Sequence, residues 1–297
     1  MKKNLVFGVM PIILLSVLLF IILGGCGKKE EPIVAPTQIN FATDYQSGLK
    51  LAQDKGQKLI IDFNTDWCTW CKRLDTVTFV DSAVIAMSQN LVFAKINAEK
   101  DTVTAQLYKV RGYPTVVLMN ADGSEIDRIG GYLPPDEFME TINGYLRGVN
   151  TLDYFLKKAD SAPSAELNYR IGEKYSDRGM YPEAESYFAK VVAADPDNKE
   201  LRTDSAMALM ADIKRRDKKY DEALVEFKKI MEKFPGTGQA ADAELWIAVV
   251  HKQKGDTTMA IQAFESFLKN HPESGDTAYA TQQIEKLKNP PKPDSVK

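Results

Sequence analysis

The chain has 297 residues, 44% of them hydrophobic, which is enough for one large domain or two ordinary ones. Its 38 basic and 41 acidic side chains nearly balance, so the charge gives no reason to expect a nucleic-acid partner. Three cysteines are too few for the dense disulfide framework of a small stapled protein. Structural zinc needs about four Cys or His ligands, and the two histidines lie far along the chain from every cysteine. We expect no metal and no cofactor.

The first 25 residues have the layout of an export signal, in which two lysines precede an apolar run from Leu5 to Leu23. The run ends in Leu23-Gly24-Gly25-Cys26, which resembles the bacterial lipoprotein signal. That resemblance implies cleavage before Cys26, lipidation of its thiol and a membrane anchor. Alternatively, residues 4–23 are long enough to stay as an uncleaved membrane helix. Both interpretations put the folded part outside the cytoplasm, on the periplasmic side of the inner or the outer membrane.

Residues 26–38 are rich in Lys, Glu and Pro and lack an apolar pattern, so we expect a solvated tether there. Short apolar runs then alternate with helical patterns over residues 39–149. Strands are predicted at 58–63, 91–96, 115–119 and 125–129, and helices from the cysteine motif to about 87, at about 102–110 and at 134–145. This alternation predicts an α/β domain with a mixed central sheet flanked by helices.

Cys68-Thr69-Trp70-Cys71 lies between the first predicted strand and the helix that follows it. Alone, the pair could be half of a zinc site or an inert structural disulfide, although so short a loop removes little entropy from the unfolded chain. A helix N-terminus favours the thiolate of Cys68. We therefore expect an exposed, nucleophilic Cys68, and a more buried Cys71 that resolves the mixed disulfide.

Three further residues stand in register with this motif. Asp62 lies six residues before the first cysteine, Lys95 lies in the second predicted strand, and Pro114 precedes the third. With them, residues 40–148 resemble the thioredoxin family. The resemblance implies a thioredoxin fold, a cis Pro114 against the cysteine pair, and a Lys95 close to a buried Asp62. Burial should raise the pKa of Asp62, which could then carry a proton for Cys71, while Lys95 moderates the shift. Without the family resemblance, Asp62 would be interpreted as a polar residue at the end of a strand and Lys95 as a solvated lysine.

The stretch from Asp66 to Phe79 departs from ordinary thioredoxin, since Thr-Trp replaces Gly-Pro between the cysteines. It is similar to the periplasmic thioredoxin-like domain of the transmembrane thiol electron carrier, which implies a membrane protein as electron donor. Trp67 would give partner proteins a flat apolar docking rim, whereas Trp70 fits a substrate contact, or packing in the core or on the surface, equally well. Motifs of this form span about 150 mV in reduction potential, so the direction of electron flow stays open.

The second half of the chain contains an internal repeat. An alanine, a phenylalanine four residues later and a closing proline recur as Ala184, Phe188 and Pro196; as Ala223, Phe227 and Pro235; and as Ala260, Phe264 and Pro272. With Gly172 and Tyr175, these positions resemble tetratricopeptide repeats.

The resemblance implies three helix pairs over residues 164–288, ending in a capping helix at 276–288. We expect a linker at 150–163 and a disordered tail at 289–297. Such repeats bind a peptide or protein on a concave face, or act as a spacer or dimerisation unit.

Together these features predict an extracytoplasmic, membrane-anchored thiol–disulfide oxidoreductase, expected to be a disulfide reductase. Its substrates would be protein thiols and disulfides, and its repeats would recruit partner proteins. Two alternatives remain: a binding scaffold whose thioredoxin-like part is a passive platform, and a thiol reductase for cytochrome c maturation.

Overall fold

The computed structural model describes residues 36–290. The expected signal over 1–25, the lipidated Cys26, most of the tether and residues 291–297 of the tail lie outside this range. Within it, no helix combines the length and the apolar character needed to cross a lipid bilayer.

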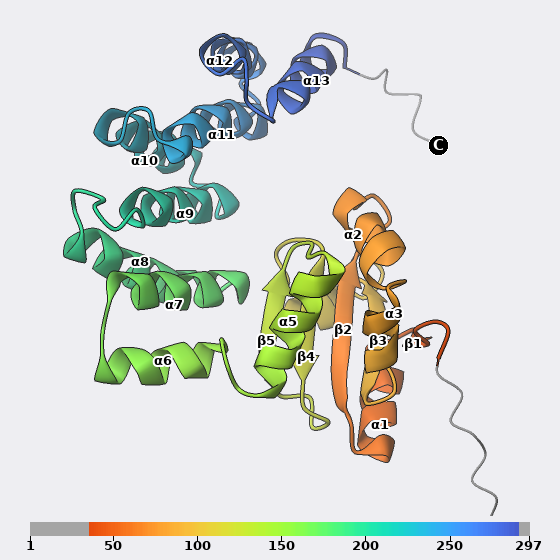
Figure 1. The fold of residues 1–297 in the computed structure, drawn as a ribbon. Coiled ribbons are helices and arrows are strands. Elements are labelled where there is room, and N and C mark those ends of the chain that lie inside the picture. The colour runs from red at the N-terminus through yellow and green to blue at the C-terminus, as the bar shows by residue number, and fades with distance from the viewer. Residues whose placement is uncertain (1–35, 291–297) are drawn as a thin grey trace, which may run out of the picture. The chain divides into compact units, whose positions relative to one another are not determined.

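The first domain is built on a five-stranded mixed sheet with strand order β1-β3-β2-β4-β5 (Figure 1). The strands are β1 (Phe41–Ala42), β2 (Lys58–Asn64), β3 (Leu91–Asn97), β4 (Thr115–Met119) and β5 (Glu125–Gly130). The central strand β2 pairs in parallel with β3 and antiparallel with β4. The four predicted strands are confirmed to within one residue at each end, as is the predicted mixed sheet.

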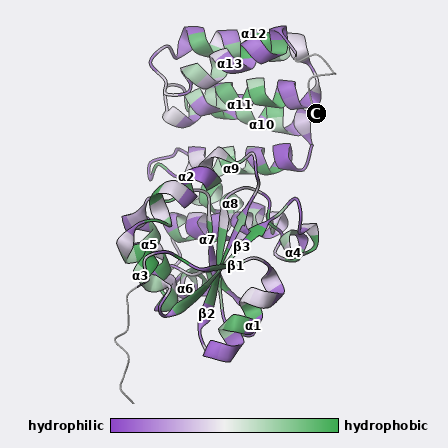
Figure 2. Cartoon of the chain, turned by 90° about the vertical axis from the view of Figure 1, so that its right-hand side faces the viewer, coloured by the Kyte–Doolittle hydropathy of each residue, from purple (hydrophilic) through white to green (hydrophobic). Residues whose placement is uncertain are grey.

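Helices cover both faces of this sheet. They are α1 (Tyr45–Lys55), α2 (Thr69–Arg73), the π-helical turn η1 (Leu74–Thr78), α3 (Ser82–Met87), α4 (Thr102–Leu107) and α5 (Pro135–Leu146). Side chains alternate along β2: Leu59 and Ile61 pack with residues of α1 and α4, whereas Ile60 packs with residues of η1, α3 and α5. By the same alternation Asp62 faces η1, α3 and α5. Figure 2 shows hydrophobic residues in green in the strands and on parts of the helices.

The helix after the cysteines is shorter than predicted. Instead of continuing to residue 87, the helical segment formed by α2 and η1 ends at Thr78, and α3 begins as a separate helix at Ser82. Asp81 starts α3 because its carboxylate accepts hydrogen bonds from the amides of Ala83 (2.9 Å) and Val84 (3.2 Å). The helix predicted at 102–110 likewise ends early, at Leu107, because Lys109 adopts a left-handed φ of 49°.

A series of helices follows the first domain, and the repeat pattern predicts its packing correctly. The helices are α6 (Leu152–Ser161), α7 (Ala165–Asp177), α8 (Tyr181–Ala194), α9 (Thr203–Arg216), α10 (Tyr220–Lys233), α11 (Gly238–Lys254), α12 (Thr257–Asn270) and α13 (Thr277–Lys288). All three repeated alanines and all three repeated phenylalanines are fully buried. The helix pairs are therefore α7–α8, α9–α10 and α11–α12, with α13 as the capping helix.

Helix α6 occupies most of the segment at 150–163 that we expect to link the two domains. Its N-cap is Thr151, whose hydroxyl accepts a 3.2 Å hydrogen bond from the amide of Tyr154. The helix packs against α7. The chain thus enters the repeats through an ordered helix.

Candidate active site

The cysteine pair lies at the start of α2, directly after the central strand. Cys68 is the N-cap residue of α2 and is disulfide-bonded to Cys71. Each cysteine is only 3% exposed, so the expected contrast between an exposed Cys68 and a buried Cys71 is wrong for this oxidised form. The Cys68 sulfur accepts a 3.0 Å hydrogen bond from the amide of Cys71.

Two tryptophans next to Cys68 remain exposed. Trp67 is 65% exposed and Trp70 is 57% exposed, so Trp70 lies on the surface and not in the core. The indole N–H of Trp67 donates a 2.8 Å hydrogen bond to Glu99, and its ring meets Tyr113 edge-on at 5.9 Å between centroids. Trp70 stacks on Tyr132 with centroids 5.6 Å apart. Both indoles are thus held in place while offering apolar surface to solvent.

The peptide bond between Tyr113 and Pro114 is cis, as the family resemblance implies. The carbonyl oxygen of Pro114 accepts a 2.8 Å hydrogen bond from the amide of Gly131, just after β5. Gly131 has a φ of 102°, in the left-handed region that favours glycine. The loops before β4 and after β5 are therefore joined.

Asp62 is buried, with only 1% of its surface exposed. Its Oδ1 has no hydrogen-bond partner among the described residues, and its Oδ2 is a long 3.4 Å from the side-chain amide of Asn64. Burial raises the pKa of Asp62 to about 7; Lys95 lowers it and the negative charge of Asp75 raises it further. The raised pKa and the moderating effect of Lys95 are both as expected.

Lys95 is the register partner of Asp62 on the parallel strand β3. Its ammonium group nevertheless forms an ion pair with Asp75, and lies 4.6 Å from the ring centroid of Phe41 and 5.6 Å from that of Phe79. Lys95 is therefore not a fully solvated lysine: it pairs with Asp75, and it acts on Asp62 through its charge. Sequence reasoning assigned no role to Asp75, although its place one helical turn after Cys71 is a signal that could have revealed it.

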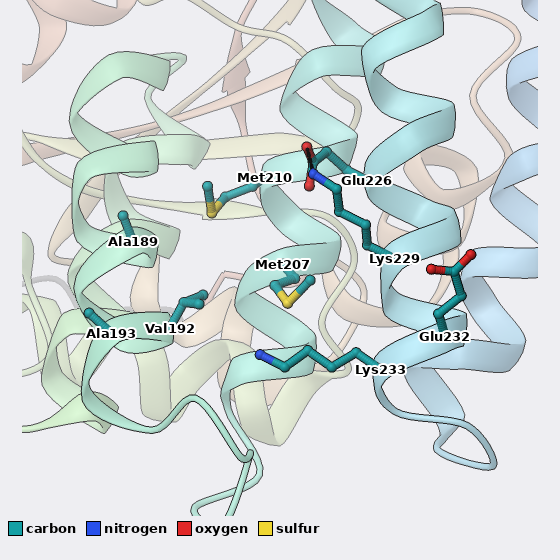
Figure 3. Close-up of a pocket in the computed structure, with 9 residues that line it drawn as sticks. All are labelled: Ala189, Val192, Ala193, Met207, Met210, Glu226, Lys229, Glu232 and Lys233. Carbon is teal, nitrogen blue, oxygen red and sulfur yellow. Dashed lines mark hydrogen bonds and ion pairs between the residues drawn. The ribbon is translucent and has the colours of Figure 1, made fainter.

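A separate groove lies on the repeats, between α8, α9 and α10. It has a volume of about 640 Å³. Figure 3 shows Met207 and Met210 of α9 between the small side chains of α8 and the charged side chains of α10, which are Glu226, Lys229, Glu232 and Lys233. Methionine side chains adapt to varied apolar partners. The charged side chains at the rim would keep the surface around the groove hydrated when no partner is bound.

Comparisons with known families divide the chain in the same way. Residues 45–145 match the model of a thioredoxin-like domain, residues 165–198 a tetratricopeptide repeat, and residues 203–282 a family described as an outer membrane lipoprotein. The chain thus carries a thioredoxin-like domain with a thioredoxin fold, followed by tetratricopeptide-type repeats.

Among curated proteins, the chain is similar to thiol:disulfide interchange proteins DsbD. It is 28% identical to that of Haemophilus ducreyi over 122 residues, which are 39% of this chain and 21% of that protein. For Vibrio vulnificus the identity is 30% over 121 residues, 39% of this chain and 20% of that protein. The chain therefore spans about a fifth of the length of these relatives.

Two solved structures are also similar. A DsbH oxidoreductase is 19% identical, with 42% of this chain and 94% of that chain covered and a TM-score of 0.34. A thioredoxin from Thermus thermophilus is 24% identical, with 36% of this chain and 85% of that chain covered and a TM-score of 0.34.

Proposed function

We propose that this protein is a disulfide reductase that acts on other proteins outside the cytoplasm. The observation that carries the proposal is the Cys68–Cys71 disulfide at the start of α2, between two exposed tryptophans. Disulfide exchange needs a thiolate, a nearby resolving thiol and a surface on which a protein can dock. The matches to thiol:disulfide interchange proteins support the same chemistry.

The reaction begins with the reduced pair. The Cys68 thiolate attacks one sulfur of the substrate disulfide, a Cys68–substrate bond forms, and the substrate's other sulfur leaves as a thiolate that takes up a proton. Cys71 then loses its proton and attacks the Cys68 sulfur, which expels the second substrate thiol. The substrate gains two electrons and two protons, and Cys68–Cys71 becomes a disulfide. A membrane-embedded dithiol protein would return the two electrons.

Four residues near the pair have supporting roles in this proposal. Asp62 accepts the proton of Cys71, for which a pKa of about 7 is well suited. Lys95 limits the rise in the pKa of Asp62. Trp67 forms part of the docking rim, and Pro114 presents its neighbouring backbone to an extended substrate strand.

The other parts of the chain would hold the catalytic domain at a membrane and bring it close to its partner proteins. Residues 39–149 are the catalytic domain, and the repeats at 164–288 recruit a peptide or protein. Lipidated Cys26 anchors the chain to an envelope membrane, and residues 26–38 hold the folded part away from it. The match of residues 203–282 to an outer membrane lipoprotein family supports an envelope location.

A trapping experiment tests the catalytic role. A Cys71→Ala variant lacks the resolving thiol, so mixed disulfides with protein partners should accumulate through Cys68 and disappear in a Cys68→Ser, Cys71→Ala double variant. The wild-type protein should also reduce insulin faster than free thiol does at the same concentration. Failure of both assays would rule out the reductase function.

The groove lined by Met207 and Met210 favours a second candidate, a scaffold whose repeats bind partners without redox chemistry. A scaffold predicts that replacing both cysteines by serine leaves the cellular phenotype intact, whereas deletion of residues 164–288 abolishes it. A reductase predicts that the cysteine variant already has the phenotype.

A further inference from the structure

An aromatic shelf is built around Trp70, the residue directly before Cys71. It consists of Trp70, Tyr132 and Arg73. Trp70 stacks on Tyr132 with an interplanar angle of 28°, and the Arg73 guanidinium lies 5.5 Å from the centroid of the same tyrosine ring. Trp70 is 57% exposed. The shelf is thus a flat apolar surface with a cation attached to it.

The position of the shelf is fixed by the loop that carries Tyr132. On one side of Tyr132, the amide of Gly131 donates to the carbonyl oxygen of Pro114 at 2.8 Å. On its other side, the carbonyl oxygen of Leu133 accepts a 2.7 Å hydrogen bond from the hydroxyl of Thr78. The shelf is therefore continuous with the cis-proline loop, and a chain that reaches Cys68 past Pro114 would also meet the shelf.

The charged residues next to Trp70 differ from those next to Trp67. In the shelf, Arg73 is exposed and forms no ion pair with any residue between 36 and 290, and the same holds for its chain neighbour Lys72. Next to Trp67, Asp66 forms an ion pair with Lys100 at 3.3 Å, whereas Glu99 accepts the hydrogen bond from Trp67 and forms no ion pair among the described residues. The face is consequently positive beside Trp70 and negative beside Trp67.

We propose that the shelf selects substrate proteins in which a glutamate or aspartate lies within a few residues of the reactive cystine, on the segment that passes over Trp70. The acid would pair with Arg73 while neighbouring apolar atoms cover the indole. This inference rests on the proposed reductase function and names its substrate class.

The test uses the reduced full-length protein and synthetic peptides linked by one disulfide. Each peptide carries glutamate, glutamine or lysine at a single position, either two residues before or two residues after the cysteine. The measured quantity is the second-order rate constant of reduction, followed by tryptophan fluorescence. In one of the two placements, the glutamate peptide should react about threefold faster than the glutamine peptide at low salt, and the lysine peptide slower still. The differences should largely vanish at about 1 M salt.

Variants of Arg73 assign the effect to the shelf. Arg73→Glu should reverse the order of the three peptides, whereas Arg73→Lys should keep it. The matched control is Lys55→Glu, which makes the same change in net charge at an exposed position next to the opposite end of β2; it should leave the order unchanged. Trp70→Ala should slow all peptides similarly.

The outcomes separate this inference from the function on which it rests. If the glutamine peptide is reduced no faster than by a Cys68→Ser, Cys71→Ser variant, the reductase function itself fails. If that peptide is reduced but both placements show equal rates for all three residues, or Arg73→Glu and Lys55→Glu act alike, the shelf does not select acidic segments.

Discussion

Asp127 and Lys174 form a buried ion pair that joins the thioredoxin-like domain to the first repeat helix, with 2.9 Å between Asp127 Oδ1 and Lys174 Nζ. The Asp127 side chain on β5 is fully buried, and that of Lys174 on α7 is 13% exposed. The other carboxylate oxygen accepts from the amide of Leu152 at 2.7 Å and lies 3.3 Å from a guanidinium nitrogen of Arg178. The hydroxyl of Tyr145 accepts a further 2.7 Å bond from Lys174. The two domains thus share a buried polar cluster.

Removing the carboxylate should destabilise the protein and uncouple the domains. Asp127→Ala leaves the largely buried charge of Lys174 without its ion-pair partner and leaves Arg178 paired with Glu125 alone, and breaking a buried pair in this way typically costs about 3 to 5 kcal/mol. Urea unfolding followed by tryptophan fluorescence and by far-UV circular dichroism should give coincident transitions in the wild type and separate ones in the variant. Glu265→Ala is the control, since Glu265 pairs with Lys288 at 2.8 Å on the surface; it should cost at most about 1 kcal/mol. Coincident transitions with an unchanged midpoint in Asp127→Ala would contradict this role.

Asp62 should make the oxidised protein less stable as pH rises. Its pKa is about 7 in the folded state, against 3.8 ordinarily, so between these values the folded state binds more protons than the unfolded state. The free energy of unfolding therefore falls from about pH 4 to about pH 7. One pH unit is worth about 1.4 kcal/mol, so the full loss is roughly 4 kcal/mol. Denaturant titrations at pH 4 to 8 measure it.

Asp62→Asn is the matched variant for this measurement, because it keeps the shape of the side chain but cannot ionise. Relative to the wild type, it should gain stability steadily over the same pH range and keep a constant difference above it. If the two proteins have parallel pH profiles from pH 4 to 8, Asp62 does not carry a raised pKa.

Asp75 should help to set the pKa of Asp62. Asp75→Asn removes a negative charge that raises the pKa of Asp62, and it releases Lys95 to interact with Asp62 alone. The pKa of Asp62 should therefore fall, as followed by carbon NMR of its carboxyl group, and the proposed proton transfer from Cys71 should weaken. Asp54→Asn breaks an exposed aspartate–lysine pair on α1 and should leave that pKa unchanged. An unaltered pKa in Asp75→Asn would remove Asp75 from the site.

The sequence predicts the frame of this site better than its side-chain pairing. Apolar runs locate β2, β3 and β4, because buried strands need continuous apolar residues, and the register of Asp62 and Pro114 with the cysteines follows from family resemblance. The ion pair between Lys95 and Asp75 could not be predicted in this way. The pair depends on how α2 widens into η1, and on two phenylalanine rings that stabilise the ammonium. Such contacts combine segments far apart in the chain, so the position of Asp75 one turn after Cys71 marks it as a candidate but does not identify Lys95 as its partner.

Gly172 should be essential for the close contact between α7 and α8. A Cβ atom at this position would lie 2.5 Å from Cε1 of the buried Phe188 ring. We expect Gly172→Ala to destabilise the repeats by about 1 to 3 kcal/mol through overpacking, despite the higher helix propensity of alanine. Gly238→Ala at the start of α11 meets open space and should be neutral or stabilising. Adding Phe188→Leu to Gly172→Ala should recover part of the loss in a double-mutant cycle, because the smaller side chain makes room for the methyl group. If the two substitutions are additive in urea unfolding, the ring is not what excludes a side chain at Gly172.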